Sequence, residues 1–292
     1  MIEESGEFRS ADGRLVTFSR YGPAEGRRVV FHYGTPGTRH LSERATNVLA
    51  RRGAQILVLD RPGYGESSRW PGRRVADVVG DVAMVGDLHG WDRFAVWGGS
   101  GGGPHALACG TLLADRVERC ASVVGPAPYD ADGLNWIGGM SPGNVEEFDR
   151  ALEGEASYRP LVERLANEAV EAVRSGEVPL GPEYELPEAD VEALRTRMTD
   201  PGYLERTIAM HTGGIDGWID DAVAFVKPWG FDPTEISVPV SVWYGPDDVL
   251  CPRAHAEWLL AHIPGAERHE LPAGHLLGDE ELDAIYGWLL GL

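Results

Sequence analysis

One serine stands among five glycines in the sequence WGGSGGGPH, which runs from Trp97 to His105. The residues from Gly98 to Gly102 fit the pattern G-x-S-x-G, in which the serine occupies a sharp turn between a strand and a helix. Glycines on both sides of the serine let the backbone fold back on itself, and the strained turn exposes the hydroxyl at a helix N-terminus. This pattern predicts that Ser100 is a nucleophile.

The same glycines fit two other interpretations. The residues from Gly101 to Ala106 match G-x-G-x-x-A, which is typical of a dinucleotide-binding loop. Such a loop usually follows the first strand of a domain, and it requires an acidic residue at the end of the next strand, where this chain has Val-Val-Gly-Pro-Ala-Pro. A plain glycine loop is the third interpretation. We favour the nucleophile because the rest of the chain supplies the partners that it needs.

A serine nucleophile needs a general base and a carboxylate that orients the base, in the chain order Ser, Asp or Glu, His. Asp248 follows a predicted strand at residues 240–244, and a carboxylate just past the carboxyl end of a parallel strand faces the active crevice. Asp247 is the reserve choice. His275 follows the last predicted strand, residues 268–271, and is the expected base. The neighbouring histidines lie inside a predicted helix or strand and are less free to reach the serine: His255, His262 and His269.

An oxyanion hole of two backbone N–H groups would complete such a site. One donor is the N–H of Gly101, directly after the serine. The second is expected from the sequence HYGTPGTR, which follows a predicted strand at residues 28–32. Because Pro36 has no N–H, Thr35 is the expected donor, and the flanking glycines permit a sharp bend.

Short apolar strands alternate with segments of helical spacing in both terminal parts of the chain, which predicts a parallel sheet covered by helices on both faces. A hairpin about Asp12-Gly13 precedes them. The expected strands are residues 28–32, 55–59, 94–97, 117–124, 240–244 and 268–271. The expected helices are residues 41–52, 75–88, 104–114, 252–262 and 281–290.

This alternation stops between residues 126 and 235, where only helices and loops are expected. The helical candidates there are residues 145–152, 158–174, 188–198 and 215–225. We therefore expect an α/β core formed by residues 1–125 and 236–292, interrupted by a helical cap formed by residues 126–235.

Composition and charge exclude several classes of partner. A net charge of −20 argues against binding to nucleic acid or to anionic membranes, and no apolar run approaches the ~20 residues that cross a bilayer. The first residues are acidic and polar, unlike a secretory signal. Three cysteines without metal-ligand spacing, Cys109, Cys120 and Cys251, suit a reducing compartment. We expect a cytoplasmic protein that acts on a small molecule, and the sequence leaves its oligomeric state open.

Four motifs in the expected order make the chain similar to the α/β-hydrolase fold superfamily with a helical cap. They are Tyr33-Gly34-Thr35-Pro36-Gly37, Asp60-Arg61-Pro62-Gly63-Tyr64-Gly65-Glu66-Ser67, the turn at Ser100, and the turns at Asp248 and His275. Residues 217–221 and 228–232 also resemble segments near the end of the cap in bacterial members. The Asp60–Ser67 turn is expected to be structural.

The resemblance implies a role for each of these site residues. Ser100 is the nucleophile, His275 acts first as base and then as acid, and Asp248 orients it. Thr35 and Gly101 form the oxyanion hole. One departure is Tyr33, since the family often has His-Gly at this turn, but the donors are backbone groups and do not depend on that side chain.

A serine at this turn favours acyl transfer through a covalent ester, whereas relatives with an aspartate there open epoxides or displace halide. Esters, lactones, thioesters and small amides are therefore the expected substrates, and no metal or organic cofactor is needed. The cap selects among them. Three of its residues are expected to line an apolar acyl pocket: Trp136, Met140 and Trp218.

The cap is strongly acidic, with 23 of the 46 acidic residues and 8 of the 26 basic ones. A solvated helical surface is one explanation. The other is an acidic mouth that attracts cationic substrates, or carboxylates that hold a free amino group. That explanation would suggest an aminopeptidase of the proline iminopeptidase type, which the chain resembles in architecture. A third hypothesis is a biosynthetic enzyme or a receptor that reuses the pocket without hydrolysis.

Overall fold

The computed structural model describes the backbone of residues 2–292 and the side chains from Glu4 onward, and its centre is an eight-stranded sheet. The strands are β1 Ile2–Arg9, β2 Leu15–Gly22, β3 Arg27–His32, β4 Ala54–Leu59, β5 Phe94–Gly99, β6 Val117–Val123, β7 Val240–Tyr244 and β8 Glu267–Glu270. Their order is β1-β2-β4-β3-β5-β6-β7-β8, and all pairs from β4 across to β8 are parallel. This mostly parallel sheet confirms the predicted fold class.

Helices cover both faces of the sheet because its central strands are apolar on both sides. All six residues of β4 and all five of β7 are buried. On one face lie α2 (Val79–Leu88), α3 (Gly103–Leu112) and α9 (Arg253–His262), and on the other lie α1 (Glu43–Arg52) and α10 (Asp279–Leu289). The sheet is therefore the middle layer of three, as alternating strands and helices predicted.

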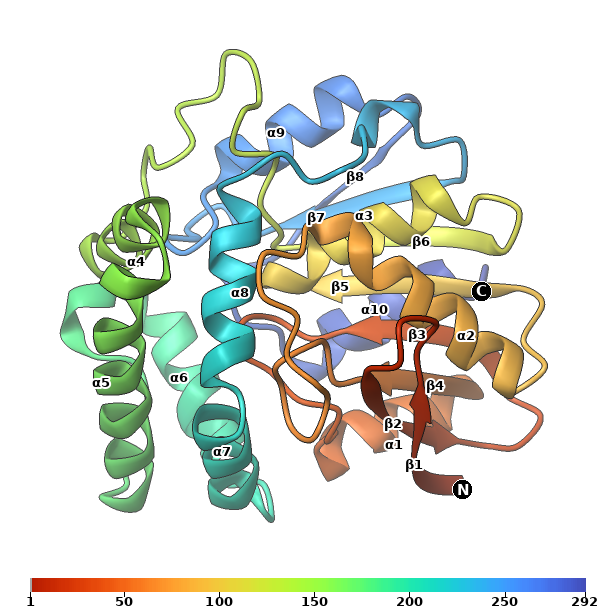
Figure 1. Ribbon diagram of the computed structural model, residues 1–292, viewed down its shortest axis with the longest axis horizontal. Helices are drawn as coiled ribbons and strands as arrows, with labels where there is room; N and C mark the ends of the chain where they lie inside the picture. The colour runs from red at the N-terminus through yellow and green to blue at the C-terminus, as the bar shows by residue number, and fades with distance from the viewer. Residues whose placement is uncertain (1) are drawn as a thin grey trace.

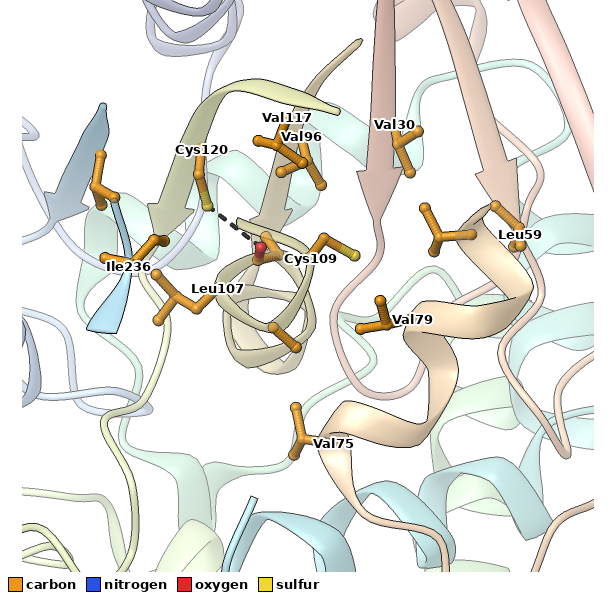
Figure 2. Packing of buried hydrophobic residues seen from close by; sticks show 14 of the residues in the cluster. Val30, Leu59, Val75, Val79, Val96, Leu107, Cys109, Val117, Cys120 and Ile236 are labelled. Atoms are coloured by element: carbon orange, nitrogen blue, oxygen red, sulfur yellow. Dashed lines mark hydrogen bonds between the residues drawn. The ribbon is translucent and has the colours of Figure 1, made fainter. Parts of the chain in front are cut away.

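Figure 2 shows part of the core around α3, where strand side chains surround the helix: Val30, Val96 and Val117. The Sγ of Cys120 on β6 donates to the backbone oxygen of Ala106 at 3.3 Å. Cys109 and Cys120 are both free and buried. They act as small side chains of the hydrophobic core.

The chain between β6 and β7 forms a separate group of helices, which we call the helical insertion. Its helices are α4 Pro142–Glu153, α5 Glu155–Arg174, α6 Glu188–Met198, α7 Tyr203–Thr212 and α8 Ile215–Phe225. They have a core of their own, which includes Tyr158, Val162 and Ile219. In Figure 1 the insertion lies to the left of the sheet, at the end toward which the arrow of β5 points. The turns that follow the parallel strands are therefore beside it.

Helix α7 has no counterpart among the helices expected from the sequence. Its buried side chains are Thr207 and His211, which are polar. The apolar residues of α7, such as Leu204 and Ile208, are only partly buried, so they do not form the continuous apolar stripe that reveals an amphipathic helix. Among residues 2–292, no helix is both long and apolar enough to cross a membrane.

Candidate active site

Ser100 occupies the turn between β5 and α3, where a short 3-10 turn at Ser100–Gly102 joins the two elements. Its φ of 53° is in the left-handed region, which costs ~1–3 kcal/mol for a residue with a side chain. A Cβ on Gly98 would overlap the backbone of Gly102, and a Cβ on Gly102 would overlap the carbonyl oxygen of His32. This crowding is the reason for the G-x-S-x-G spacing.

His275 and Asp248 are hydrogen-bonded through Nδ1 and Oδ2 at 2.7 Å. Asp248 lies in the turn after β7, and its Oδ1 accepts hydrogen bonds from the N–H groups of Leu250 and Cys251, both at 2.8 Å. The carboxylate is held from both sides and fixes the ring through Nδ1, so Nε2 is the nitrogen left to exchange a proton. Asp247, the reserve choice, is exposed instead.

The electrostatics of His275 suit a group that gains a proton during a reaction. Burial of the ring favours its neutral form, but the charge of Asp248 and the hydrogen bond with it outweigh burial, so the pKa of His275 is raised above 6.5. Asp190 on α6 also fixes the backbone here, because its carboxylate accepts hydrogen bonds from the N–H groups of His275 at 2.9 Å and Leu276 at 2.8 Å. Ser100 and His275 both line one cavity of about 1680 Å³.

The loop after β3 lies directly against the turn at Ser100. A Cβ on Gly34 would be 3.3 Å from the Cβ of Ser100. A Cβ on Gly101 would be 2.9 Å from the Cβ of Thr35 and would overlap its hydroxyl. Thr35 and Gly101, whose N–H groups are the expected donors to an oxyanion, are thus neighbours beside the serine.

A buried carboxylate that the sequence analysis did not single out ties this loop to the helical insertion. Asp221 of α8 has a fully buried side chain. Its Oδ2 accepts hydrogen bonds from Thr35 Oγ1 at 2.8 Å, from Arg61 Nη2 at 2.7 Å and from the hydroxyl of Tyr64 at 2.8 Å. Burial would raise the pKa of Asp221, but the nearby arginines outweigh it and hold that pKa well below its usual value.

Arg61 extends the same cluster to the backbone of the loop. It donates to the carbonyl oxygens of Tyr33 at 2.5 Å and Gly34 at 2.7 Å. On the other side of the carboxylate, Arg73 pairs with Asp221 Oδ1. The two sequence segments that supply Arg61 and Asp221 both stood out as motifs, but nothing in the sequence indicated that they touch. The structural role expected for the Asp60–Ser67 turn is therefore to hold the loop beside Ser100.

Two of the three expected pocket residues line the cavity. Met140 and Trp218 are in its wall, whereas Trp136 is not. The ring of Trp136 is buried, its Nε1 donates to Ala127 O at 2.8 Å, and it packs edge-on against Phe148. Trp136 follows β6 closely in the chain, but closeness in the chain does not fix the direction of a side chain.

The cavity wall also holds one buried carboxylate of the insertion, Glu147. It accepts hydrogen bonds from the hydroxyls of Tyr158 at 2.5 Å and Tyr184 at 2.7 Å, and from Trp218 Nε1 at 3.1 Å. Burial is the main reason that the pKa of Glu147 is raised. These three donors join α4, α5, α8 and the segment between α5 and α6, so Glu147 is a packing centre of the insertion.

Comparisons with known proteins agree with this architecture. A family model described as alpha/beta hydrolase fold matches residues 27–282. Epoxide hydrolase B of Mycobacterium tuberculosis is 32% identical over 133 residues, which are 44% of this chain and only 36% of that protein. Proline iminopeptidase of Neisseria gonorrhoeae is 24% identical over 301 residues, which cover 96% of this chain and 93% of that protein.

The likeness extends to solved structures. The enol-lactonase from Burkholderia xenovorans LB400 superimposes with a TM-score of 0.68 over 98% of both chains. Its sequence is 18% identical to this one, so this likeness describes the shared fold alone.

Proposed function

The chain belongs to the α/β hydrolase fold family, as its motifs predicted, and we propose that it is a serine hydrolase of carboxylic esters or lactones. One arrangement carries the proposal. The hydrogen-bonded pair of His275 and Asp248 opens on the same cavity as Ser100, whose strained turn presents a hydroxyl. The surrounding core of residues 1–125 and 236–292 supplies these groups, and residues 126–235 form the cap over them.

The first half of the reaction forms an acyl-enzyme. The Oγ of Ser100 attacks the ester carbonyl carbon while Nε2 of His275 takes the hydroxyl proton. Negative charge moves to the carbonyl oxygen, where the N–H groups of Thr35 and Gly101 stabilise it. The tetrahedral intermediate then expels the alcohol, which receives the proton from His275, and the acyl group remains on the serine.

The second half releases the acid. A water molecule gives a proton to His275 and attacks the acyl carbonyl, and the intermediate expels Ser100, which takes the proton back. Asp248 stays ionised and stabilises the imidazolium in both halves through Nδ1–H. The net reaction consumes one water and yields one acid and one alcohol, or one hydroxy acid from a lactone.

The proposal is tested with p-nitrophenyl esters of short acids and with a fluorophosphonate probe. We expect turnover of the esters and covalent labelling of Ser100. Ser100→Ala should abolish both while the protein stays folded, and Ser157→Ala, a change on α5, should leave both unchanged. If the wild-type protein shows neither ester turnover nor labelling, the proposed function is wrong.

An aminopeptidase is the second candidate, because the proline iminopeptidase relative covers almost the whole chain and a buried carboxylate lines the cavity. Against it, both oxygens of Glu147 already accept hydrogen bonds from protein donors. Other acids of the insertion pair with arginines at the surface, as Glu155 does with Arg69. Release of proline from its p-nitroanilide, with loss on N-acetylation, would favour this candidate over the esterase.

A further inference from the structure

Helix α6 is fastened to the loop that carries His275 at two points. Near its start, Asp190 accepts hydrogen bonds from two N–H groups of that loop. Two turns later, Arg197 Nη2 donates to the backbone oxygen of Leu277 at 2.9 Å. Residues seven positions apart lie on the same side of a helix, so this side of α6 faces the catalytic loop. The guanidinium of Arg197 is thereby held beside it, in the wall of the cavity that contains Ser100.

Arg197 has no carboxylate partner among the side chains of residues 4–292, unlike the other arginines in the cavity wall. The partners of those arginines are Asp279 for Arg44, Glu168 for Arg164, Glu188 for Arg195 and Asp200 for Arg206. The bond to Leu277 uses one N–H of Arg197. A guanidinium has five N–H donors, so most of those of Arg197 remain for a ligand.

The guanidinium of Arg197 is half-buried and keeps its charge without a paired carboxylate. Burial, together with the positive charge of Arg44, lowers the pKa of Arg197, but a guanidinium keeps its proton in proteins. The charge of Asp190 favours the charged form of Arg197 without pairing with it, so an anion that binds to the guanidinium adds the ion pair that it lacks. The nearby Asp190 uses both of its carboxylate oxygens on the N–H groups of His275 and Leu276 and forms no ion pair with Arg197.

We propose that Arg197 is an anion subsite of the catalytic cavity, and that the substrate is an ester or lactone that also carries a carboxylate. Arg197 binds this second group with the planar pair of N–H donors that suits a carboxylate, while the ester carbonyl lies at Ser100. The reaction at the ester rests on the proposed function, whereas the binding of the carboxylate does not. This proposal predicts an anionic substrate, whereas the acidic insertion had suggested a cationic one.

The test compares esters that differ in one charge. The p-nitrophenyl hemi-esters of glutaric and adipic acid are paired with p-nitrophenyl pentanoate and hexanoate, and the Ser100→Ala protein supplies the background rate. We expect wild type to prefer the charged member of each pair. Arg197→Met should lower kcat/KM for the charged esters by about 10- to 100-fold more than for the neutral esters, because both kinds of ester lose the support of the loop at Leu277 but only the charged ones lose the ion pair. Arg197→Lys should restore part of the preference.

Controls separate recognition from structural support. Arg174→Met removes the same charge from the insertion at a position outside the cavity wall and should not alter the preference. If Arg197→Met slows charged and neutral esters equally, the residue only supports the loop at Leu277 and the subsite is refuted. Absence of any preference in wild type refutes it as well.

A binding experiment keeps the subsite testable if no ester is hydrolysed, an outcome that would refute the proposed function alone. Calorimetric titration of the Ser100→Ala protein with adipate should then show binding at millimolar concentration, and the same titration of the Ser100→Ala, Arg197→Met protein should show none. Adipate that does not bind, or that binds both proteins equally, overturns the subsite.

Discussion

The hydroxyl of Thr35, in the loop beside the nucleophile, donates a hydrogen bond of 2.8 Å to the carboxylate of Asp221 on a helix of the insertion. The same carboxylate binds Arg61, which also donates hydrogen bonds to the carbonyl oxygens of Tyr33 and Gly34. The residue that supplies the proposed oxyanion donor is therefore hydrogen-bonded to the buried carboxylate of a helix in the insertion, whose residues line the cavity. A shift of α8 on substrate binding would be passed directly to Thr35.

Thr35→Val tests this link with little change of shape. The variant loses the hydroxyl that reaches Asp221 but keeps the backbone N–H that is proposed to bind the oxyanion. We expect kcat for p-nitrophenyl acetate to fall about 3- to 10-fold with KM nearly constant, because a donor that is less well fixed stabilises the transition state less. Thr46→Val on α1 is the control and should match wild type. A rise in KM alone would contradict this reasoning.

Asp221→Asn tests the cluster as a contributor to stability. The change removes the negative charge that Arg61 and Arg73 share in the protein interior, and breaking a buried pair in this way costs about 3–5 kcal/mol. Urea unfolding at neutral pH measures the loss of unfolding free energy. The adjacent Asp220 pairs with the more exposed Arg69, so Asp220→Asn should cost clearly less. Equal losses of unfolding free energy in the two variants would show that the buried cluster stabilises the protein no more than the exposed pair does.

Asp248→Asn and Asp247→Asn form a matched pair of adjacent substitutions. An amide at 248 cannot hold the His275 tautomer that presents a free Nε2 to the serine, so we expect kcat to fall by about 10³- to 10⁴-fold. The exposed neighbour does not hold the ring, and its change should alter kcat less than about twofold. Steady-state kinetics on one ester decides between them, and the reverse ranking would overturn the choice of acid.

The raised pKa of His275 determines how kcat/KM depends on pH on the acidic side of the profile. The base must be neutral to accept the serine proton, so kcat/KM should increase with pH through a midpoint above 6.5. Asp248→Asn removes the two larger effects that raise this pKa and leaves burial, which lowers it, with only the charge of Asp190 still raising it, so the midpoint of the residual activity should move downward. Profiles at constant ionic strength measure both midpoints. A midpoint that does not move in the variant would show that Asp248 does not tune the ring.

The same shift links stability to pH. A group whose pKa is raised in the folded state contributes its full stabilisation below the unfolded value of 6.5 and loses it as pH rises through the folded value. The contribution of the His275–Asp248 pair to the unfolding free energy should therefore decrease on the alkaline side of 6.5. Comparison of wild type with Asp248→Asn by urea unfolding at several pH values isolates this contribution.

The parts of the site that the sequence predicted depend on local chemistry or on strand order. The turn at Ser100 is visible because the glycines that its crowding requires, Gly98 and Gly102, both lie within two positions of the serine in the sequence. Asp248 and His275 could be chosen because each follows a strand of a parallel sheet, whose carboxyl ends meet at one edge. Topology thus brought together residues that are far apart along the chain.

The parts that the sequence did not predict depend on tertiary contacts between distant segments. Arg61 and Asp221 are 160 positions apart, and no local pattern says which of many charged residues becomes buried with which. Arg197 differs from the other arginines of the cavity wall because it has no carboxylate partner, and a sequence does not show which arginine stays unpaired. Helix α7 packs through polar residues, and the direction of the Trp136 ring is decided by its contact with Phe148.

Glu147→Gln distinguishes a structural carboxylate from one that recognises an amine. Its three donors come from the hydroxyls of Tyr158 and Tyr184 and from the indole of Trp218. A glutamine keeps one acceptor oxygen but turns an NH₂ toward a donor, so the unfolding free energy should fall by about 1–3 kcal/mol.

Because Glu147 supports the packing of the insertion, we expect the variant to keep its activity at low temperature, where it stays folded. Its kcat/KM for a neutral ester should then be within a fewfold of wild type. The exposed Glu146→Gln, next to it on α4, is the control and should change neither quantity. If Glu147→Gln instead removes activity on proline p-nitroanilide without loss of stability, the carboxylate binds a substrate amine and the aminopeptidase is the better description.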